Sequence, residues 1–275
     1  MRETHEATPA ESVWIASAAT ASHVVEDAEE LRFIQREAPW RVRATAGGEA
    51  ALLGRWREHL DDCAVLGLWC APLRVPQLVV DLIRVARERG FTRLVGPLVP
   101  EDSVGPYLAA GMGVVGRVVL MRLERPERAC GRERAPGGIE IRPAVPGEAS
   151  SLTAVDAASF DEFWRYDAPS LSRYLKTERA AVATKDEVAV GYTLATVRGS
   201  EGSLGRLAVA PAARHGGVGR ALACEAVGWL VRNGARAVTL SRQEHNPAAL
   251  ELYRAMGFRD LRGALVVPVS EELRA

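Results

Sequence analysis

Residues 207–222 read LAVAPAARHGGVGRAL: an apolar strand runs into Pro211, a glycine-rich loop follows, and a helix begins at once. Glycines let a backbone approach a bound group closely, and the first amides of a helix point toward an anion that the helix dipole also favours. The stretch therefore predicts a phosphate-binding loop made by Arg214, His215, Gly216, Gly217, Val218, Gly219 and Arg220.

The spacing of these glycines argues against two common nucleotide-binding patterns. It is not the GxxxxGK[ST] loop of mononucleotide hydrolases. Nor is it a GxGxxG turn followed by a ribose-binding acid at the usual distance. The loop is therefore expected to hold a pyrophosphate of another kind.

A second motif begins at Asn246-Pro247, after a predicted strand over 237–241. Asn caps a helix with its side-chain oxygen, and Pro fits the first helical position. Tyr253 follows Asn246 by seven residues, two helical turns, and Met256-Gly257 ends the helix. One helix can therefore present Asn246 and Tyr253 to the same ligand.

Together the two motifs resemble those of the GNAT superfamily of N-acetyltransferases. The family's acetyl-CoA loop reads Gln/Arg-x-x-Gly-x-Gly/Ala, which Arg214, Gly217 and Gly219 match. Its second signature, Asn-x-x-Ala-x-x-x-Tyr-x-x-x-Gly-Phe, is matched by Asn246, Ala249, Tyr253, Gly257 and Phe258. The resemblance covers roughly 139–269, and the N-terminal half matches only weakly.

The resemblance implies how acetyl-CoA is held and used. The pantetheine arm would pair like an added strand with Leu207, Ala208 and Val209, and the pyrophosphate would lie on 214–220 beside Asn246. Backbone amides near Val209 would polarise the thioester carbonyl. Tyr253 would protonate the departing thiolate, since a phenol of pKa ~10 and a thiol of pKa ~8.5 exchange protons readily.

The acceptor must lose a proton before or during attack, and here the sequence departs from better-known members of the family. Many carry a glutamate on the strand before the loop, whereas 203–206 read SLGR with no carboxylate. Glu201 and Glu244 are the nearest acids in sequence, and either could act through water. His215, in the loop, and His245, before the helix cap, are weaker candidates.

The acceptor site in the family lies after the first helix of the domain. There this chain has three aromatic residues among acids, Phe160, Trp164 and Tyr166. Such a mixture suits a cationic amine through cation–π and charge attraction. The alternative, weighed equally, is ordinary packing beside a solvated acidic loop.

An internal repeat indicates two tandem domains. Tyr107 precedes Tyr253 by 146 residues, and Gly90 precedes Gly234 by 144. The N-terminal counterpart of the loop, LRVPQ at 73–77, has no glycine, and its Pro76 lacks an amide. The first copy is therefore expected to bind acetyl-CoA poorly, to buttress the second and to wall the acceptor site.

The expected fold class is α/β (α+β): two tandem GNAT-like domains, each a mixed, mostly antiparallel twisted sheet flanked by helices. The expected divisions are a disordered tail at 1–10, a degenerate GNAT-like domain at 11–125, a linker at 126–138 and a catalytic GNAT domain at 139–275. In the first domain the pattern predicts strands over 13–17, 40–45, 63–70 and 118–123, and a helix over 78–89.

Composition limits the partners. The 35 basic and 35 acidic residues cancel, so the overall charge gives no reason to bind nucleic acid or an anionic membrane. No stretch is long and apolar enough to predict a membrane span. The four cysteines show no metal-ligand spacing, so we expect no metal and buried free thiols in a reducing cytoplasm. The protein is expected to be a monomer or a homodimer.

The sequence thus predicts transfer of an acetyl group from acetyl-CoA to a primary amine, on a small molecule or at a peptide N-terminus, by direct attack in a ternary complex. A longer acyl-CoA donor is an alternative within the same chemistry. A protein that binds acyl-CoA without catalysis, as a sensor or scaffold, is an alternative of another class.

Overall fold

The computed structural model describes residues 3–22, 24–131 and 135–273. The chain divides into two compact units. The first unit comprises Met1–Arg117 with Leu265–Ala275, and the second comprises Val118–Ala264. Each unit is a mixed, mostly antiparallel sheet flanked by helices, as predicted.

In the first unit the sheet order is β1-β2-β3-β4-β5, followed by the end of β13. The ladder is antiparallel except between β4 and β5, which are parallel. The elements are β1 (His5–Glu6), α1 (Pro9–Ala21), α2 (Ala28–Glu37), β2 (Val42–Ala44), β3 (Ala50–Arg55), β4 (Asp62–Trp69), α3 (Val75–Glu88), β5 (Arg93–Val95), β6 (Val99–Pro100), α4 (Gly105–Ala109) and the start of β7 (Met112–Leu123).

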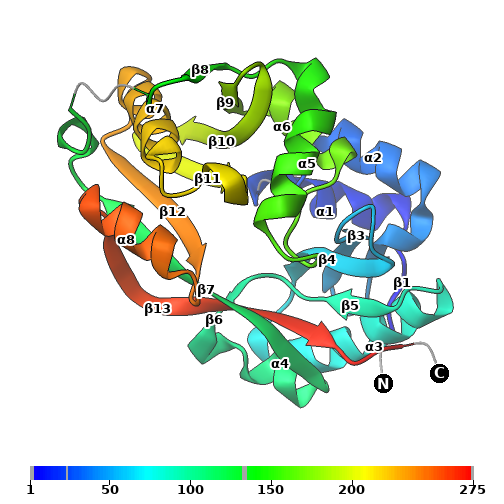
Figure 1. Ribbon diagram of the computed structural model, residues 1–275. Coiled ribbons are helices and arrows are strands. Elements are labelled where there is room, and N and C mark those ends of the chain that lie inside the picture. The colour runs from blue at the N-terminus through cyan, green and yellow to red at the C-terminus, as the bar shows by residue number, and fades with distance from the viewer. Residues whose placement is uncertain (1–2, 23, 132–134, 274–275) are drawn as a thin grey trace. The chain divides into compact units, whose positions relative to one another are not determined.

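In the second unit the order is β7-β12-β11-β10-β9-β8, and among the pairings of the described residues only that of β11 with β12 is parallel. The elements after β7 are β8 (Ile139–Pro143), α5 (Ala149–Ser159), α6 (Ala168–Thr177), β9 (Arg179–Lys185), β10 (Val188–Arg198), β11 (Glu201–Val209), α7 (Val218–Arg232), β12 (Ala237–Gln243), α8 (Pro247–Ala255) and β13 (Arg259–Ser270) (Figure 1).

Helices cover both faces of the second sheet. Successive residues of a strand point to opposite faces, and β9 shows this directly. Val182 packs with residues of α5 and α6, such as Leu152 and Leu171, whereas its neighbour Ala183 packs with Leu222 of α7. The β9–β11 part of the sheet is therefore covered by α5 and α6 on one face and by α7 on the other.

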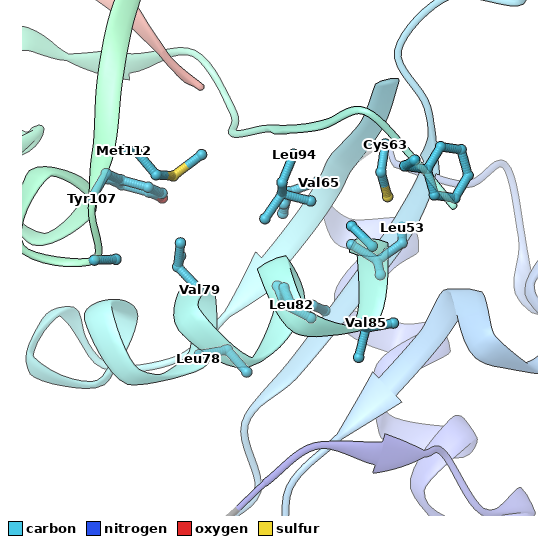
Figure 2. Close-up of a cluster of buried hydrophobic side chains, with 14 of the residues drawn as sticks. Leu53, Cys63, Val65, Leu78, Val79, Leu82, Val85, Leu94, Tyr107 and Met112 are labelled. Atoms are coloured by element: carbon cyan, nitrogen blue, oxygen red, sulfur yellow. The ribbon is translucent and has the colours of Figure 1, made fainter. Parts of the chain in front are cut away.

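The core of the first unit forms where α3 and α4 pack on the sheet. Figure 2 shows Leu78, Val79, Leu82 and Val85 of α3 in one buried cluster with Leu53, Cys63, Val65 and Leu94, and with Tyr107 and Met112 beside them. The exposed fraction of Tyr107 is 6%, and so is that of Tyr253. The repeat predicted from the sequence thus places a buried tyrosine at the same point of each unit.

The two copies differ at the loop. Helix α3 begins three residues after Pro72, whereas α7 begins seven residues after Pro211. The first copy therefore lacks the residues that correspond to Arg214–Gly217, in addition to glycines.

The N-terminal expectations were wrong in two places. Residues 3–10 are ordered: β1 pairs with β2, and Thr8 caps α1 in a capping box with Glu11. Residues 1–2 lie outside the described part. The predicted strand over 13–17 is helix, because Ser12, Ile15, Ala16 and Ala19 are buried at helical spacing.

Strand pairing also gives unit boundaries other than the expected ones, which were the end of the first domain at 125, the end of the linker at 138 and the start of the second domain at 139. Residues 118–123 of β7 pair with β12 in the second unit. In the first unit, Val269 of β13 pairs with Val95 of β5. Residues 132–134 of the predicted linker, and 274–275, lie outside the described residues.

The cysteine expectation was wrong for two of the four. Cys130 and Cys224, 94 residues apart, form a disulfide that ties the segment after β7 to α7. Cys63 and Cys70 are free thiols, and burial raises the pKa of Cys63 to about 12.

Candidate active site

The parallel ladder between β11 and β12 ends part-way along both strands. Its last pair is Leu204 with Leu240, although β11 continues to Val209 and β12 to Gln243. The two strands then separate (Figure 1). Residues 206–209 of β11 therefore keep an edge without a strand partner among the described residues.

A β-bulge marks the point of separation. Leu194 of β10 pairs with Arg206, and Ala195 pairs with Leu204, so Gly205 is an extra residue in β11. A bulge bends its strand and increases the local twist. Gly205 therefore accounts for β11 turning away from β12 directly after Leu204.

Backbone groups of Leu207 and Val209 face the open edge. The amide of Ala210 donates to the carbonyl of Val190 on β10, so by the alternation of an antiparallel pair Ala208 also faces β10. The carbonyl of Val209 already accepts hydrogen bonds from Ser159 Oγ at 3.1 Å and from Arg214 Nε at 3.0 Å. Of the three residues predicted to pair with pantetheine, Leu207 and Val209 therefore offer groups on the open side.

The loop after β11 is exposed from Arg214 to Gly217. His215 (φ 61°) and Gly217 (φ 84°) are both in the left-handed region. Gly217 is the N-cap of α7. Within the described part of the chain, no side chain caps the start of α7, as an anion-binding helix end requires.

The two loop glycines differ in how strictly conformation and space require them. Gly217 has a left-handed φ, which a residue with a Cβ rarely adopts. A Cβ there would also lie only 3.3 Å from Pro136 Cγ. A Cβ on Gly219 would meet Val209 Cγ2 at 3.6 Å and Leu252 Cδ2 at 3.7 Å, in ordinary contact. Gly217 is thus the position that tolerates a side chain least.

Tyr253 lies in the packed cluster that contains Leu204 and Leu240, the last pair of the ladder. Its ring packs against Phe258 with 5.7 Å between centroids. Burial, with no hydrogen bond to offset it, raises the pKa of Tyr253 above its ordinary value. Tyr253 therefore stays a protonated phenol at neutral pH, the form that can donate a proton.

Asn246 performs the capping role predicted for it. Its Oδ1 accepts the backbone N–H of Ala249 at 3.0 Å at the start of α8. The same cap orients the helix that carries Tyr253.

The structure places the two predicted acids at opposite ends of the strands. Glu201, at the start of β11, accepts hydrogen bonds from Arg122 at 2.6 and 2.9 Å, and that pairing lowers the pKa of Glu201. Glu244 follows the end of β12, 3.9 Å from His245. The side chain of His245 is 95% exposed.

Two of the three predicted acceptor-site aromatics, Phe160 and Tyr166, stack on an internal arginine, and the third, Trp164, contributes its backbone carbonyl. The guanidinium carbon of Arg206 lies 3.5 Å from the ring centroid of Phe160 and 4.1 Å from that of Tyr166. Its Nη2 donates to the carbonyl of Trp164 at 3.1 Å. The cation that these residues face is thus a group of the chain itself.

Arg206 in turn forms a salt bridge with Asp156, which sequence reasoning missed. Arg206 Nε and Nη2 donate to the two carboxylate oxygens at 2.8 and 2.6 Å, and the Asp156 side chain is fully buried. Tyr192 OH and the backbone N–H of Tyr166 also donate to Asp156. The signal was an aspartate on the inward face of a helix, beside Leu152 and Val155.

The described residues contain neither a metal-binding cluster nor a membrane-spanning helix. No group of three or more His, Cys, Asp or Glu side chains could hold a metal ion. Within the same residues, no helix is both long and apolar enough to cross a bilayer.

Comparison with known proteins agrees with this geometry. Residues 150–258 match the model of the acetyltransferase (GNAT) family. A mycothiol acetyltransferase of Pseudarthrobacter chlorophenolicus is 28% identical over 226 residues, 73% of this chain and 68% of that protein. A mycothiol acetyltransferase of Frankia alni is 29% identical over 175 residues, 55% of this chain and 53% of that protein. The chain thus spans about half the length of the second relative.

Solved structures share the tandem fold. A GCN5-related N-acetyltransferase from Sphaerobacter thermophilus superposes with a TM-score of 0.64 at 20% identity, covering 100% of this chain and 96% of that one. A tandem GNAT protein from the clavulanic acid biosynthesis pathway superposes with a TM-score of 0.63 at 17% identity, covering 85% and 82%. The predicted fold class is confirmed.

Proposed function

Residues 150–258 form an acetyltransferase domain of the GNAT family, and from that premise we propose that the chain transfers an acetyl group from acetyl-CoA to a primary amine. The observation that carries the proposal is the ladder ending at Leu204 and Leu240, with an anion-binding loop at the far end of the open edge. The pantetheine arm lies along 207–209 and the pyrophosphate on 214–220.

The reaction is direct attack in a ternary complex. The amine nitrogen forms a bond to the acetyl carbonyl carbon and gives up one proton, the carbon–sulfur bond breaks, and the thiolate takes the phenolic proton of Tyr253, which solvent then replaces. Burial raises the pKa of Tyr253, so the phenol is present in its protonated form at neutral pH. A backbone N–H on the open edge, that of Leu207, polarises the thioester carbonyl.

The second unit carries the activity, and the first does not bind acetyl-CoA. The short connection between Pro72 and α3 supports this division of roles, since it leaves no loop to hold a pyrophosphate.

The acceptor is a small-molecule amine or a peptide N-terminus. Because the two curated relatives are named for mycothiol, a mycothiol-related amine belongs in the acceptor panel beside simple amines and a short peptide. The guanidinium of Arg206 already stacks on the rings of Phe160 and Tyr166. These two aromatic residues therefore shape the site and do not bind a cationic amine.

The test is calorimetric titration with acetyl-CoA, followed by measurement of thiol release with glycinamide, glucosamine, a mycothiol-related amine and the peptide Ala-Ala-Ala. Binding with thiol release supports the transferase. Binding without release from any acceptor favours the non-catalytic acyl-CoA sensor, and absence of binding contradicts both.

A further inference from the structure

One carboxylate that sequence analysis did not consider lies at the point where β11 and β12 separate. A Cβ built on Gly205, the bulge residue, would lie 3.6 Å from Glu178 Oε2. Glu178 is far from Gly205 in sequence, and folding brings it across β10 to β11. The stretch that lacks a glutamate of its own thus has one beside it in space.

The backbone fixes the position of Glu178. The residue joins α6 to β9, and its N–H donates to the carbonyl of Tyr174 at 2.8 Å as the C-cap of α6. The next residue, Arg179, already pairs with Ala195 of β10. Glu178 is therefore held between a helix and a sheet, as a side chain with a chemical role should be.

The carboxylate is half-buried and makes no hydrogen bond or ion pair with any residue that the structure describes. Burial raises the pKa of Glu178, and Arg198 on β10 lowers it by a smaller amount. The nearby guanidinium on β11, Arg206, is engaged by Asp156. A desolvated acid without a fixed partner is unfavourable for stability and typical of a group that acts on a ligand.

The position of the thioester follows from the strand. If pantetheine runs along β11 from the loop, it passes Val209 first and approaches Gly205 last, about 13 Å further on at ~3.3 Å per residue. Tyr253 belongs to the same buried cluster as Leu204 and Leu240, on the strands that separate there. The acetyl group would then lie between a proton donor and Glu178.

Resting on the function proposed above, we infer that Glu178 is the general base, which contacts the acceptor amine and removes its proton. As the nitrogen bonds to the acetyl carbon and the carbon–sulfur bond breaks, the nitrogen's proton passes to the Glu178 carboxylate. The thiolate receives the proton of Tyr253. Glu178 then releases its proton to solvent, and Tyr253 regains one.

The kinetic test compares Glu178→Gln with Glu187→Gln, an exposed glutamate in the turn between β9 and β10. With acetyl-CoA and the fastest of the four acceptors, E178Q should lower kcat by at least about 30-fold while the Kd for acetyl-CoA stays within twofold. E187Q should match wild type. The E187Q enzyme should keep the fall in kcat/KM that wild type shows at low pH, the acid limb of the profile. The E178Q enzyme should lose that fall.

A stability measurement shows that the loss is not misfolding. Because the folded-state pKa of Glu178 is raised, the charged group destabilises the fold increasingly as pH rises from its unfolded pKa to its folded one. At pH 7, E178Q should therefore unfold at the same temperature as wild type or a higher one. A folded E178Q that retains more than a third of wild-type kcat, or an unchanged acid limb, overturns the assignment. Wild type that binds acetyl-CoA but acetylates no acceptor overturns the proposed function instead, and this inference with it.

Discussion

Leu204 of β11 and Leu240 of β12 are the last residues that the two parallel strands pair, and both pack against the cluster that contains Tyr253. This one relationship joins the parts of the site. On the C-terminal side of the pair the edge of β11 is open and leads to the loop at 214–217. Tyr253 shares the buried cluster of that pair, and the carboxylate of Glu178 lies beside Gly205, the residue after Leu204.

Replacing Tyr253 by Phe should remove the proton donor and keep the packing with Phe258. We expect kcat to fall at least tenfold, about 1.4 kcal/mol of barrier, with the Kd for acetyl-CoA unchanged. Thiol release under saturating acetyl-CoA, with calorimetry for binding, measures both quantities. A Y253F enzyme as fast as wild type would remove Tyr253 from the mechanism.

The pH dependence of the same residue has a definite sign. Because the pKa of Tyr253 is raised, the donor form is present throughout the neutral and mildly alkaline range. The rate should therefore show no loss from Tyr253 as pH rises toward ~10, the ordinary pKa of a phenol. An alkaline limb near pH 8 that disappears in Y253F would contradict this.

Gly217→Ala should weaken acetyl-CoA binding at least tenfold. The new Cβ strains a left-handed residue and crowds Pro136, so the loop amides shift. Gly234→Ala is the matched control, because Gly234 (φ 94°) ends α7 with no atom within 4 Å of an added Cβ. Each variant should lose about 1–2 kcal/mol of stability, and only G217A should lose binding. Equal affinities in calorimetry would exclude the loop as the pyrophosphate site.

Asp156→Asn should destabilise the protein by about 3–5 kcal/mol, because Arg206 is left as an uncompensated charge in the interior. Glu162→Gln is the control, since its ion pair with Arg165 at 3.2 Å is at the surface. That change should cost less than about 1 kcal/mol. Urea unfolding of both variants measures the difference, and similar midpoints would show that the Asp156–Arg206 pair has no special weight.

Breaking the Cys130–Cys224 disulfide should lower the free energy of unfolding by about 2–4 kcal/mol, since the bond closes a long loop in the unfolded chain. The variant C130S should show the loss, whereas C70S, which removes a free thiol, should not. The denatured, unreduced protein should titrate two thiols. Four thiols before reduction would show that the bond is absent.

The sequence was sufficient for the loop and for α8 because their signals are local. Glycine spacing, the Asn246 cap and the position of Tyr253 all lie within single strand–loop–helix segments, and the structure has those segments as predicted. The strand over 13–17 was wrong because its apolar residues fit more than one period, and the capping box at Thr8 and Glu11 indicates the helix.

Contacts between distant segments could not be predicted. Asp156 and Arg206 are 50 residues apart, and Cys130 and Cys224 are 94 apart, so no spacing rule connects them. Glu178 was missed for the same reason, since only the path of β9, β10 and β11 brings it to Gly205. The unit boundaries depend on which strands pair with one another, and composition does not specify that pairing.

The most direct test of the central claim is calorimetric titration of the purified chain with acetyl-CoA, followed by thiol release with the four acceptors on the same preparation. The account predicts one binding site per chain, affinity lost in G217A, and thiol release that Y253F reduces at least tenfold. Absence of acetyl-CoA binding to the wild-type chain would contradict it.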